Sequence, residues 1–198
     1  MIATPLLEKY GASKKFYEKT TTVFEEGKLP THYYQIVSGE IKMNNYNDEG
    51  REFIQGIFYK DQSFGEPPLF LNQKYPASAV AVEDTEILCL SKSGFMKLLE
   101  ENPSISLKII ENLAQRLYYK SVMAAEMSTQ EPEHLILKLM DHGIAYFNFK
   151  KEANGYLINF TRQQIGDLTG LRVETVIRTI KTLEKKGLLK IINRKVYR

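Results

Sequence analysis

The chain has 198 residues, of which 43% are apolar and 26% are charged, and its net charge is +3 at neutral pH. This composition excludes an intrinsically disordered chain, which would carry fewer apolar residues and a larger net charge. The longest apolar runs are only a few residues, and acidic and basic residues both stand within the first ten, so we expect no membrane span, no secretory signal, no membrane partner and a cytoplasmic location.

Cysteine, histidine and acidic residues give no sign of a catalytic or metal site. A single cysteine, Cys89, cannot form an internal disulfide or a multi-thiolate centre. It lies in the apolar run 87–90, which favours a buried small hydrophobe; a redox-active thiol is the alternative. His32, His134 and His142 are scattered, so no metal site is predicted. Without a P-loop, a nucleophile and base pattern or paired carboxylates, the chain is not expected to be an enzyme.

Charge is unevenly distributed along the chain. Residues 131–198 hold 13 Lys and Arg against 7 Asp and Glu, a net +6, whereas residues 1–130 hold 14 against 17, a net −3. From residue 171 onward there are nine basic and two acidic residues. A basic C-terminal third on a mildly acidic body favours binding to a nucleic-acid duplex over attachment to a membrane surface.

The first half of the chain has the pattern of short strands separated by turn residues. Residues 1–17 are expected to form a short helix and a loop. From residue 20 to about 92, β-branched and aromatic runs alternate with turn sequences such as 25–27 and 47–50. The strands are expected at 21–24, 33–37, 40–46, 53–59, 77–82 and 86–90. Their regular spacing predicts a closed or rolled antiparallel sheet.

A long helix is predicted from Pro103 to about Ser128, because proline favours the first helical turn and no glycine or proline interrupts the stretch. Residues spaced by three and four along it indicate the seam of a two-stranded coiled coil. This seam comprises Leu107, Ile110, Ala114, Leu117, Ser121, Ala124 and Ser128. The alternative is a helix packed on its own sheet through a second stripe of Ile109, Leu113 and Met123, and the two interpretations are compatible.

The C-terminal third begins after a hinge at about residues 128–132, where a Glu-Pro-Glu sequence breaks the long helix. The elements expected after it are an amphipathic helix at 133–147, a polar loop at 150–155, a strand at 156–160 and hairpin strands at 188–192 and 195–197. Asn193 and Arg194 form the tip of the hairpin. Arg194 is able to contact phosphate there, and a solvated tip is the alternative.

The segment 161–187 has the pattern of two helices joined by a tight turn. Thr161 and Gln164 have the spacing of a capping box, so a short helix is expected at 162–168. Gly170 can take the positive φ that a sharp turn between helices requires. The second helix is expected from about 173 to 186, with Gly187 at its C-terminal end. A helix-turn-helix of this kind places its second helix in the major groove of DNA.

The second helix of this segment has an apolar face and a polar face. The apolar stripe, expected in the core, is Val173, Val176, Ile177, Ile180 and Leu183, which leaves Glu174, Thr175, Arg178, Lys181 and Lys185 for solvent or a partner. Glu174 and Arg178 are four residues apart and share a face. Arg can donate two hydrogen bonds to guanine and Glu can accept one from cytosine, so the pair is able to read a G·C step. A surface ion pair is the alternative.

Residues throughout this segment match the pattern of a known family. They are Thr161, Arg162, Ile165, Gly166, Gly170, Glu174, Thr175, Val176, Arg178, Ile180, Leu183 and Gly187. The segment resembles the C-terminal helix-turn-helix of the cyclic-AMP receptor protein and fumarate-nitrate-reduction regulator (CRP/FNR) family, which implies Glu174 and Arg178 as base readers. The candidate sets are then Glu174, Arg178 and Arg172 for bases, and Thr161, Arg162, Gln163, Thr175, Lys181 and Arg194 for phosphates.

Two positions depart from the family pattern. Val173 stands where the cyclic-AMP branch carries a third base-reading Arg, so residues 171–175 resemble the other branch more. Ile177 stands where that other branch often has a polar reader. The resemblance therefore identifies one pair that reads G·C and leaves the rest of the half-site open.

Three short segments in the first half match known signatures. Residues 24–27 match F-x-x-G, residues 34–41 match Y-x-I-x-x-G-x-[IV] and residues 64–70 contain G-E-x-x-L-F. They resemble the family's sensor domain, a cyclic-nucleotide-binding-like β-roll. The third segment would begin the phosphate-binding cassette of that domain. In that cassette, N–H groups at a helix start hold a phosphate and Glu66 would accept a hydrogen bond from a ribose hydroxyl.

The resemblance implies a cyclic nucleotide as ligand, but the sequence departs from the pattern where the phosphate would be bound. Cyclic-nucleotide binders carry an Arg and a small hydroxyl residue after the cassette; Tyr75 and Pro76 stand there, and neither can donate a charged bidentate contact. We therefore do not expect a cyclic nucleotide, and Glu66 is expected to be a structural acceptor. The single cysteine excludes the iron–sulfur cluster known in part of the family, whereas a haem with His32 as axial ligand stays open. The candidate effector pocket is Gly65, Glu66, Tyr75, Pro76, Tyr118 and Ser121.

Together the resemblances cover nearly the whole chain and imply an α+β protein. Residues 1–102 are expected to form a cyclic-nucleotide-binding-like antiparallel β-roll sensor domain, 103–130 a dimerisation helix and hinge, and 131–198 a winged helix-turn-helix. The implied function is sequence-specific regulation of transcription by a homodimer on a palindromic duplex, with an effector of unknown identity sensed in the β-roll. Activation would add RNA polymerase as a partner, although no motif identifies a surface for it. The alternative is a small-molecule or cyclic-nucleotide sensor whose winged helix contacts proteins instead of DNA.

Overall fold

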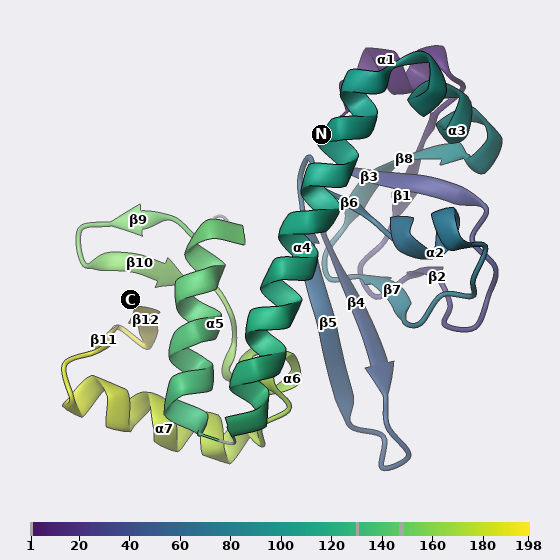
Figure 1. Cartoon of the computed structure of the whole chain (residues 1–198). Helices are drawn as coiled ribbons and strands as arrows, with labels where there is room; N and C mark the ends of the chain where they lie inside the picture. Colours follow the sequence, from purple (N-terminus) through teal and green to yellow (C-terminus); the bar gives the residue numbers. More distant parts are fainter. Residues whose placement is uncertain (1, 130, 147–148) are drawn as a thin grey trace. The chain divides into compact units, whose positions relative to one another are not determined.

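The computed structural model describes residues 2–129, 131–146 and 149–198, which form two compact units. The first unit extends to Ala114 and the second begins at Gln115, so helix α4 (Pro103–Thr129) contributes to both. Figure 1 shows the β-strands of the first unit and the helices and small sheet of the second. Each unit has buried apolar side chains of its own.

The N-terminal unit is a rolled antiparallel sheet, as the strand spacing predicts. Its strands are β1 (Ser13–Tyr17), β2 (Thr22–Phe24), β3 (His32–Ser38), β4 (Glu40–Tyr46), β5 (Glu52–Tyr59), β6 (Ser63–Phe64), β7 (Ser78–Ala81) and β8 (Thr85–Ser91). They form two four-stranded sheets with the orders β1-β8-β3-β6 and β2-β7-β4-β5. The prediction of a β-roll is confirmed.

Apolar side chains of the two sheets face each other and fill the interior of the β-roll. This cluster contains Phe24, Tyr34, Ile36, Ile41, Met43, Phe64, Tyr75, Ala77, Ala79, Ala81, Ile87 and Cys89. Alternation along the strands produces it, because every second side chain of a strand points to the same face. The register of β3 and β8, which pairs Tyr34 with Cys89 and Ile36 with Ile87, brings such residues side by side.

A second core lies between the β1-β8-β3-β6 sheet and the helices that cover its outer face. It contains Ile2, Leu7, Tyr33, Leu69, Leu88, Leu90, Phe95, Leu98 and Ile109. Apart from Ile2, which precedes α1 (Thr4–Lys9), these residues come from β3 and β8 and from α1, α2 (Glu66–Leu71), α3 (Lys92–Glu101) and the first part of α4. Because Ile109 is only 4% exposed, this part of α4 packs on its own sheet through the second stripe that the sequence indicates.

The prediction of a helix and a loop for residues 1–17 is wrong in its second part. The helix is α1, but residues 13–17 form strand β1, which pairs with β8 from Ser13 opposite Cys89 to Tyr17 opposite Thr85. Four of the five β1 side chains are exposed, so the strand lacks the alternation by which a strand is identified in a sequence. Strand β6 has two residues and is too short to leave a pattern.

The C-terminal unit is a winged helix-turn-helix, as predicted. It contains the remainder of α4, then α5 (Pro132–Tyr146), α6 (Arg162–Thr169) and α7 (Val173–Lys185). Its strands β9 (Lys151–Glu152), β10 (Gly155–Ile158), β11 (Lys190–Ile192) and β12 (Lys195–Tyr197) form an antiparallel sheet in the order β11-β12-β10-β9. Its buried residues include Leu135, Ile136, Leu139, Met140, Ile158, Phe160, Ile165, Val176, Ile180 and Leu183.

Two details of the predicted C-terminal elements differ from the structure or fall outside it. The polar loop predicted at 150–155 contains the short strand β9, which pairs with β10 through Lys151 opposite Tyr156. Residue 130 of the predicted hinge and residue 147, the predicted end of the amphipathic helix, lie outside the described residues.

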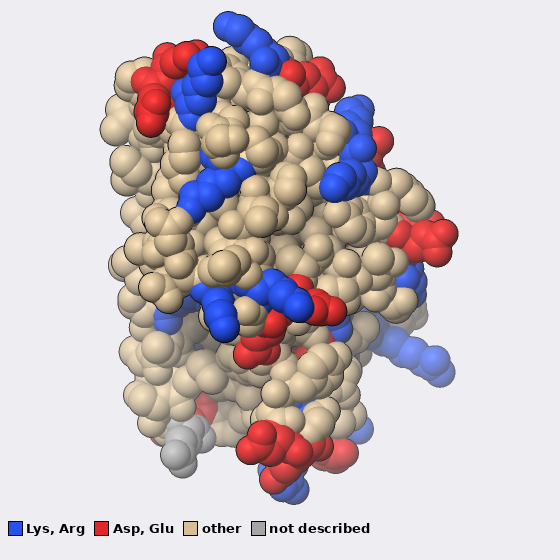
Figure 2. All heavy atoms as spheres, turned by 90° about the vertical axis from the view of Figure 1, so that its right-hand side faces the viewer, with Lys and Arg blue, Asp and Glu red and all other residues tan. Residues whose placement is uncertain are grey.

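One face of the protein carries charges of both signs. Figure 2 shows one face of the molecule, on which Lys and Arg side chains are interspersed with Asp and Glu among uncharged residues. Across the residues that the structure describes, no helix is both long and apolar enough to span a bilayer.

Candidate nucleic-acid interface and sensor interior

The first helix of the helix-turn-helix begins at a complete capping box. The Thr161 hydroxyl accepts a hydrogen bond from the Gln164 backbone N–H at 3.0 Å, and the Gln164 side-chain oxygen accepts one from the Thr161 N–H at 2.9 Å. Two backbone donors that would lack partners at the helix start are thereby satisfied. The predicted start of α6 is confirmed, and Thr161 is fixed at the exposed edge of the motif.

Glycine determines how tightly α6 and α7 are joined. Gly170 ends α6 with a φ of 75°, the left-handed conformation that the sequence predicts. Gly166 packs against the turn itself, because a Cβ at this position would lie 2.9 Å from the carbonyl oxygen of Leu171. A side chain at residue 166 would force the turn outward. This close approach fixes α7 relative to α6.

Helix α7 has a buried stripe that is narrower than predicted. Val176, Thr179, Ile180 and Leu183 are buried, so Thr179 belongs to the core although the sequence did not indicate it. Val173 is half-buried. The prediction that Ile177 lies in the core is wrong, because its side chain is 41% exposed. A stripe on a 3.6-residue helix is centred between Val176 and Ile180, and Ile177 lies at its solvent edge.

The opposite face of α7 is polar and open to solvent. Glu174, Arg178, Lys181 and Lys185 are exposed, and with Ile177 and Thr182 they surround a shallow depression along the helix. Ion pairs in this unit join Lys186 to Glu133 at 2.6 Å and Arg198 to Asp141 at 2.6 Å. Among the described residues, neither Glu174 nor Arg178 takes part in an ion pair within 4.0 Å. Their charged groups therefore face solvent.

The remaining candidates for DNA contact lie on α6, on α7 and at the tip of the β11–β12 hairpin. Arg172 is exposed at the N-cap of α7, next to Glu174. Thr161, Gln163 and Lys181 are exposed, whereas Arg162 and Thr175 are half-buried. The Gln163 amide donates to the Asp167 carboxylate at 2.8 Å. Arg194 lies at the exposed tip of the β11–β12 hairpin, where Asn193 and Arg194 have φ values of 51° and 66°, as a two-residue hairpin turn requires.

Residues of the predicted seam on α4 are exposed throughout. Leu107 and Leu117 are each 67% exposed, and Ile110, Ala114, Ser121, Ala124 and Ser128 are also exposed. Ile109 and Met123, from the second stripe, are buried. One face of α4 is therefore used within the chain, and the face with the seam carries large apolar side chains that nothing in the described chain covers.

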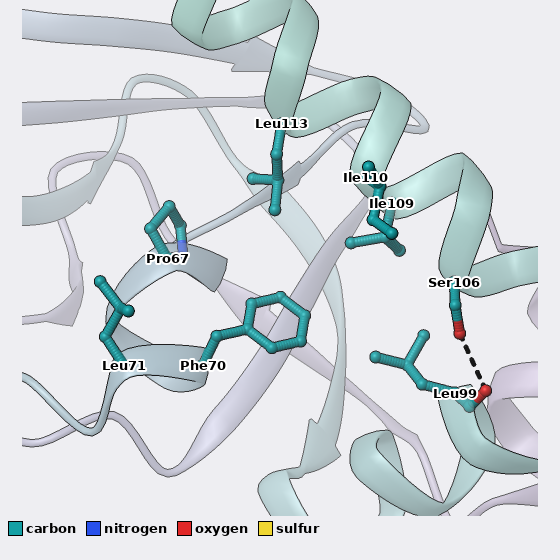
Figure 3. Close-up of a pocket in the computed structure, with 8 residues that line it drawn as sticks. All are labelled: Pro67, Phe70, Leu71, Leu99, Ser106, Ile109, Ile110 and Leu113. Carbon is teal, nitrogen blue, oxygen red and sulfur yellow. Dashed lines mark hydrogen bonds between the residues drawn. The ribbon is translucent and has the colours of Figure 1, made fainter.

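An apolar groove of about 400 Å³ lies beside the seam in the N-terminal unit. Figure 3 shows Pro67, Phe70 and Leu71 of α2 on one side and Ser106, Ile109, Ile110 and Leu113 of α4 on the other, with Leu99 of α3 at one end. The Ser106 hydroxyl donates to the Leu99 carbonyl at 2.8 Å, so the polar atom at this end is satisfied. Ile110 belongs both to the groove and to the seam, whereas none of the predicted effector residues lines the groove.

Glu66, which the sequence predicts to be a structural acceptor and not a ribose ligand, is buried. Its side chain is 2% exposed and its carboxylate accepts a hydrogen bond from the Ser63 hydroxyl. Gly65 precedes it with a φ of 77°, and a Cβ here would lie 3.1 Å from the Phe24 ring and 3.3 Å from the Tyr75 ring. The start of α2 is therefore packed against aromatic side chains.

Aromatic rings occupy the interior of the β-roll next to the predicted cassette. Phe24 and Tyr75 stack with ring centroids 3.7 Å apart and planes 9° apart, and Phe24 lies 5.9 Å from Phe64. Tyr75 is 3% exposed, and its buried hydroxyl has no hydrogen-bond partner among the described residues. Burial raises the pKa of the Tyr75 phenol, so the ring is neutral. A neutral, stacked ring cannot make the charged bidentate contact that an arginine makes with a phosphate.

The residues present do not fit the cyclic nucleotide that the resemblance implies. Pro76 is exposed, and its carbonyl accepts from the Asn45 amide at 2.6 Å. Arg51 is the sole arginine in residues 1–102, and it lies at the exposed tip of the β4–β5 hairpin, 3.7 Å from Glu49. The β-roll interior therefore lacks a guanidinium for the phosphate. Tyr118 and Ser121 are exposed on α4, and the Ser121 hydroxyl donates to the Leu117 carbonyl at 2.9 Å.

The histidines and the cysteine lie in separate parts of the chain. The His32 Nδ1 lies 2.8 Å from the Thr31 hydroxyl, and burial lowers the pKa of its imidazole. His134 and His142 lie on α5. Burial raises the pKa of the Cys89 thiol, which favours the inert, hydrophobic interpretation over a redox thiol. In the described ranges, no three residues of the types His, Cys, Asp and Glu are grouped to hold a metal ion.

Two family models match the chain. One is the cyclic nucleotide-binding domain, over residues 14–102, and the other is the Crp-like helix-turn-helix domain, over residues 134–198. The cAMP-activated global transcriptional regulator CRP of Haemophilus influenzae is 28% identical to the chain over 174 residues, which are 87% of this chain and 78% of that protein. The cyclic AMP receptor protein of Thermus thermophilus is 26% identical over 182 residues, 90% of this chain and 80% of that protein.

Solved structures show the same fold. The c-di-GMP-responsive global regulator CLP of Xanthomonas campestris has a TM-score of 0.78 to this chain at 21% identity, over 98% of each chain. A β-roll followed by a long helix and a winged helix-turn-helix defines a transcription regulator with a DNA-binding domain. The chain belongs to the CRP/FNR family of these regulators.

Proposed function

We propose that the chain acts as a homodimer that binds a specific inverted repeat in duplex DNA, with one α7 in the major groove at each half-site. The exposed polar row of α7 carries this proposal, since Glu174, Arg178 and Lys181 face solvent on a helix that Gly166 and Gly170 hold in place. In this proposal residues 1–102 form the sensor domain, 103–130 the dimerisation helix and hinge, and 131–198 the DNA-binding domain.

Base reading is assigned to Glu174 and Arg178, with Arg172 beside them. Arg178 can donate two hydrogen bonds to guanine O6 and N7, and Glu174 can accept one from cytosine N4. Both side chains are exposed and outside the ion pairs of this unit, which supports their availability to bases. Arg172 lies at the N-terminal end of α7, the end that enters the groove in helix-turn-helix proteins.

Phosphate contacts are assigned to residues of α6, α7 and the β11–β12 hairpin. These residues are Thr161, Arg162, Gln163, Thr175, Lys181 and Arg194. Lys181 and Arg194 supply positive charge, and Thr161 and Gln163 supply polar groups at the start of α6. Such contacts fix the position of the protein on the duplex without reading its sequence. We therefore expect affinity to fall steeply with salt.

Dimerisation is assigned to the exposed seam of α4. Leu107, Ile110 and Leu117 expose most of their apolar surface, a property that marks interaction sites when such residues form a continuous stripe. The apolar groove that shares Ile110 extends the same surface. A two-fold dimer through α4 would present two α7 helices to two half-sites, as palindromic operators require.

Effector sensing is assigned to the β-roll, and a cyclic nucleotide is not expected as the effector. The curated relatives are named for cyclic AMP, but here Phe24 and Tyr75 fill the interior and Tyr75 and Pro76 replace the phosphate-binding pair. Gly65, Glu66, Tyr75, Pro76, Tyr118 and Ser121 are the residues from which an effector would act. It would shift the population of dimers whose α7 helices match consecutive major grooves.

The experiment that tests the proposal is selection of bound duplexes from a random pool by the purified full chain without added effector, at a stated salt concentration. Enrichment of an inverted repeat with a G·C pair in each half would support it. Failure to enrich any sequence, either alone or with cell extract added, would contradict it.

A further inference from the structure

Ile177 occupies an unexpected place on the exposed face of α7. Glu174, Ile177, Arg178 and Lys181 have the spacing i, i+3, i+4 and i+7, so they form one continuous row on the helix. Three members of the row are charged, and Ile177 is the apolar member, 41% exposed among them. The core stripe of α7 is complete without it, because Val176, Thr179, Ile180 and Leu183 are buried.

The chemistry of the isoleucine side chain limits what it can recognise on DNA. It has neither a donor nor an acceptor, so it cannot distinguish bases by hydrogen bonds. The apolar group that base edges present in the major groove is the C5-methyl of thymine. Ile177 is also β-branched and therefore stiff at χ1, so little rotamer entropy is lost when it holds a methyl contact.

The position of Ile177 determines where such a contact would fall. Along the helix axis it lies three residues, about 4.5 Å, from Glu174, and it is adjacent in sequence to Arg178. Successive base pairs are about 3.4 Å apart. A base read by Ile177 therefore lies within about two base pairs of the G·C pair assigned to Glu174 and Arg178.

We infer that Ile177 contacts the 5-methyl group of a thymine next to that G·C pair and specifies T·A at this position of each half-site. The inference rests on the proposed function, since it requires α7 to lie in the major groove. It assigns part of the half-site that the polar residues of α7 leave unread.

Replacement of thymine by deoxyuridine tests the inference, because it removes the methyl group and leaves every hydrogen-bonding atom in place. Each thymine of the selected operator is replaced in turn, symmetrically in both halves, and the affinity of the full chain is measured at constant salt. We expect one position per half-site at which the substitution weakens binding about three- to fivefold per half-site, the effect of one buried methyl group.

Two variants identify the side chain responsible. Ile177→Ala should bind the thymine and deoxyuridine operators equally, whereas Ile177→Val, which keeps the branched Cβ, should retain part of the preference. Lys185→Ala is the matched control, because Lys185 is exposed on the same face of α7 but about two turns beyond Ile177, and the preference for thymine should be unchanged. Since Ile177 is outside the core, melting temperatures of all variants should match that of the wild type.

The outcomes separate this inference from the proposed function. If the wild type selects an inverted repeat and no deoxyuridine substitution near the G·C pair weakens binding, the inference is overturned and the proposed function stands. A methyl preference that survives unchanged in Ile177→Ala also overturns it. If the wild type selects no sequence, the proposed function itself fails.

Discussion

Gly166 faces the carbonyl oxygen of Leu171 so closely that a Cβ at residue 166 would lie 2.9 Å from that oxygen. The contact involves backbone, which cannot rotate away as a side chain could. It explains why the turn between α6 and α7 requires glycine at a position where the backbone itself is ordinary helix. The spacing of the two helices, and with it the presentation of α7, depends on this absence of a side chain.

Substitution at this contact should destabilise the protein. We expect Gly166→Ala to lower the free energy of unfolding by about 1 to 3 kcal/mol, the usual cost of overpacking a tight interior. Gly187→Ala is the control in a denaturant titration, because φ at Gly187 is 73° but nothing lies within 4 Å of its added Cβ. It carries only the cost of the left-handed backbone, about 1 kcal/mol. A smaller loss for Gly166→Ala than for Gly187→Ala would contradict the steric explanation.

Arg178 and Lys181 should contribute differently to DNA binding, although both are exposed cations on one face of α7. Arg178→Ala is expected to cost about 1 to 3 kcal/mol on the selected operator and to relax the preference at one G·C pair. Lys181→Ala should weaken binding to matched and mismatched duplexes alike. It should also reduce the salt dependence of the affinity by the amount expected for about one phosphate contact. Affinities on both duplexes over a salt series check this. Equal losses on both duplexes for Arg178→Ala would refute base reading.

A charge in the seam of α4 should dissociate the dimer. Leu117 is exposed in the single chain and would be buried in the dimer. In Leu117→Glu, two carboxylates would face each other across the two-fold axis in place of this apolar contact. We expect the variant to sediment as a monomer at micromolar concentration, where the wild type sediments as a dimer. Lys108→Glu also puts a carboxylate on the exposed surface of α4 but outside the seam, and it should remain dimeric. A monomeric wild type would refute the assignment of the seam.

The unpartnered hydroxyl of Tyr75 should make Tyr75→Phe more stable than the wild type. A buried polar group without a hydrogen bond costs about 1 to 3 kcal/mol, and the substitution removes it while keeping the ring stacked on Phe24. Tyr33→Phe is the matched control, because the buried Tyr33 hydroxyl donates to the Gln35 side-chain oxygen at 2.9 Å. That variant should lose about 1 kcal/mol. Opposite shifts in melting temperature, about 2 to 4 °C per kcal/mol, are therefore expected.

Glu40 should make stability depend on pH in the direction opposite to that of a salt-bridged acid. Burial, and then the nearby Glu83, raises the pKa of the Glu40 carboxyl from 4.5 to about 7. As the pH rises through this window the unfolded chain loses its proton first, so the protonated folded form is progressively disfavoured and stability falls. Glu40→Gln should gain stability relative to the wild type between about pH 4.5 and 7 and keep that gain above pH 7.

The size of this gain should be about 1 kcal/mol, because the Glu40 side chain is only partly buried and solvent screens its charge. Melting temperatures of both proteins over a pH series measure it. Glu100→Gln, at an exposed position of α3, serves as the control and should follow the wild type at every pH. A Glu40→Gln curve parallel to that of the wild type would contradict the raised pKa.

Local signals in the sequence were sufficient for the helix-turn-helix. The capping box of Thr161 and Gln164 and the left-handed turn at Gly170 depend on residues within a few positions of each other, so their chemistry can be read from spacing alone. The sequence does not reveal the short exposed edge strand β1, because its position depends on pairing with β8, about 70 residues later. The apolar character of Ile177 was mistaken for burial, since periodicity identifies a stripe but not its edge.

The interior of the β-roll was the least predictable part. Tyr75 stacks on Phe24, about 50 residues earlier in the chain, and both rings lie against Gly65. The sequence indicated that Tyr75 and Pro76 lack a charged donor. It gave no indication that an aromatic pair fills the space next to the cassette, because that contact arises from how two sheets close over one another.

The central claim is that a dimer reads two half-sites at once, and the dependence of affinity on half-site spacing tests it most directly. Starting from the selected operator, base pairs are inserted one at a time between the halves and the affinity of the full chain is measured. We expect binding to be strongest when the half-site centres are about 10 to 10.5 base pairs apart and to be lost to the level of a single half-site after insertion of about five. Affinity that does not change with spacing would contradict a dimeric reader.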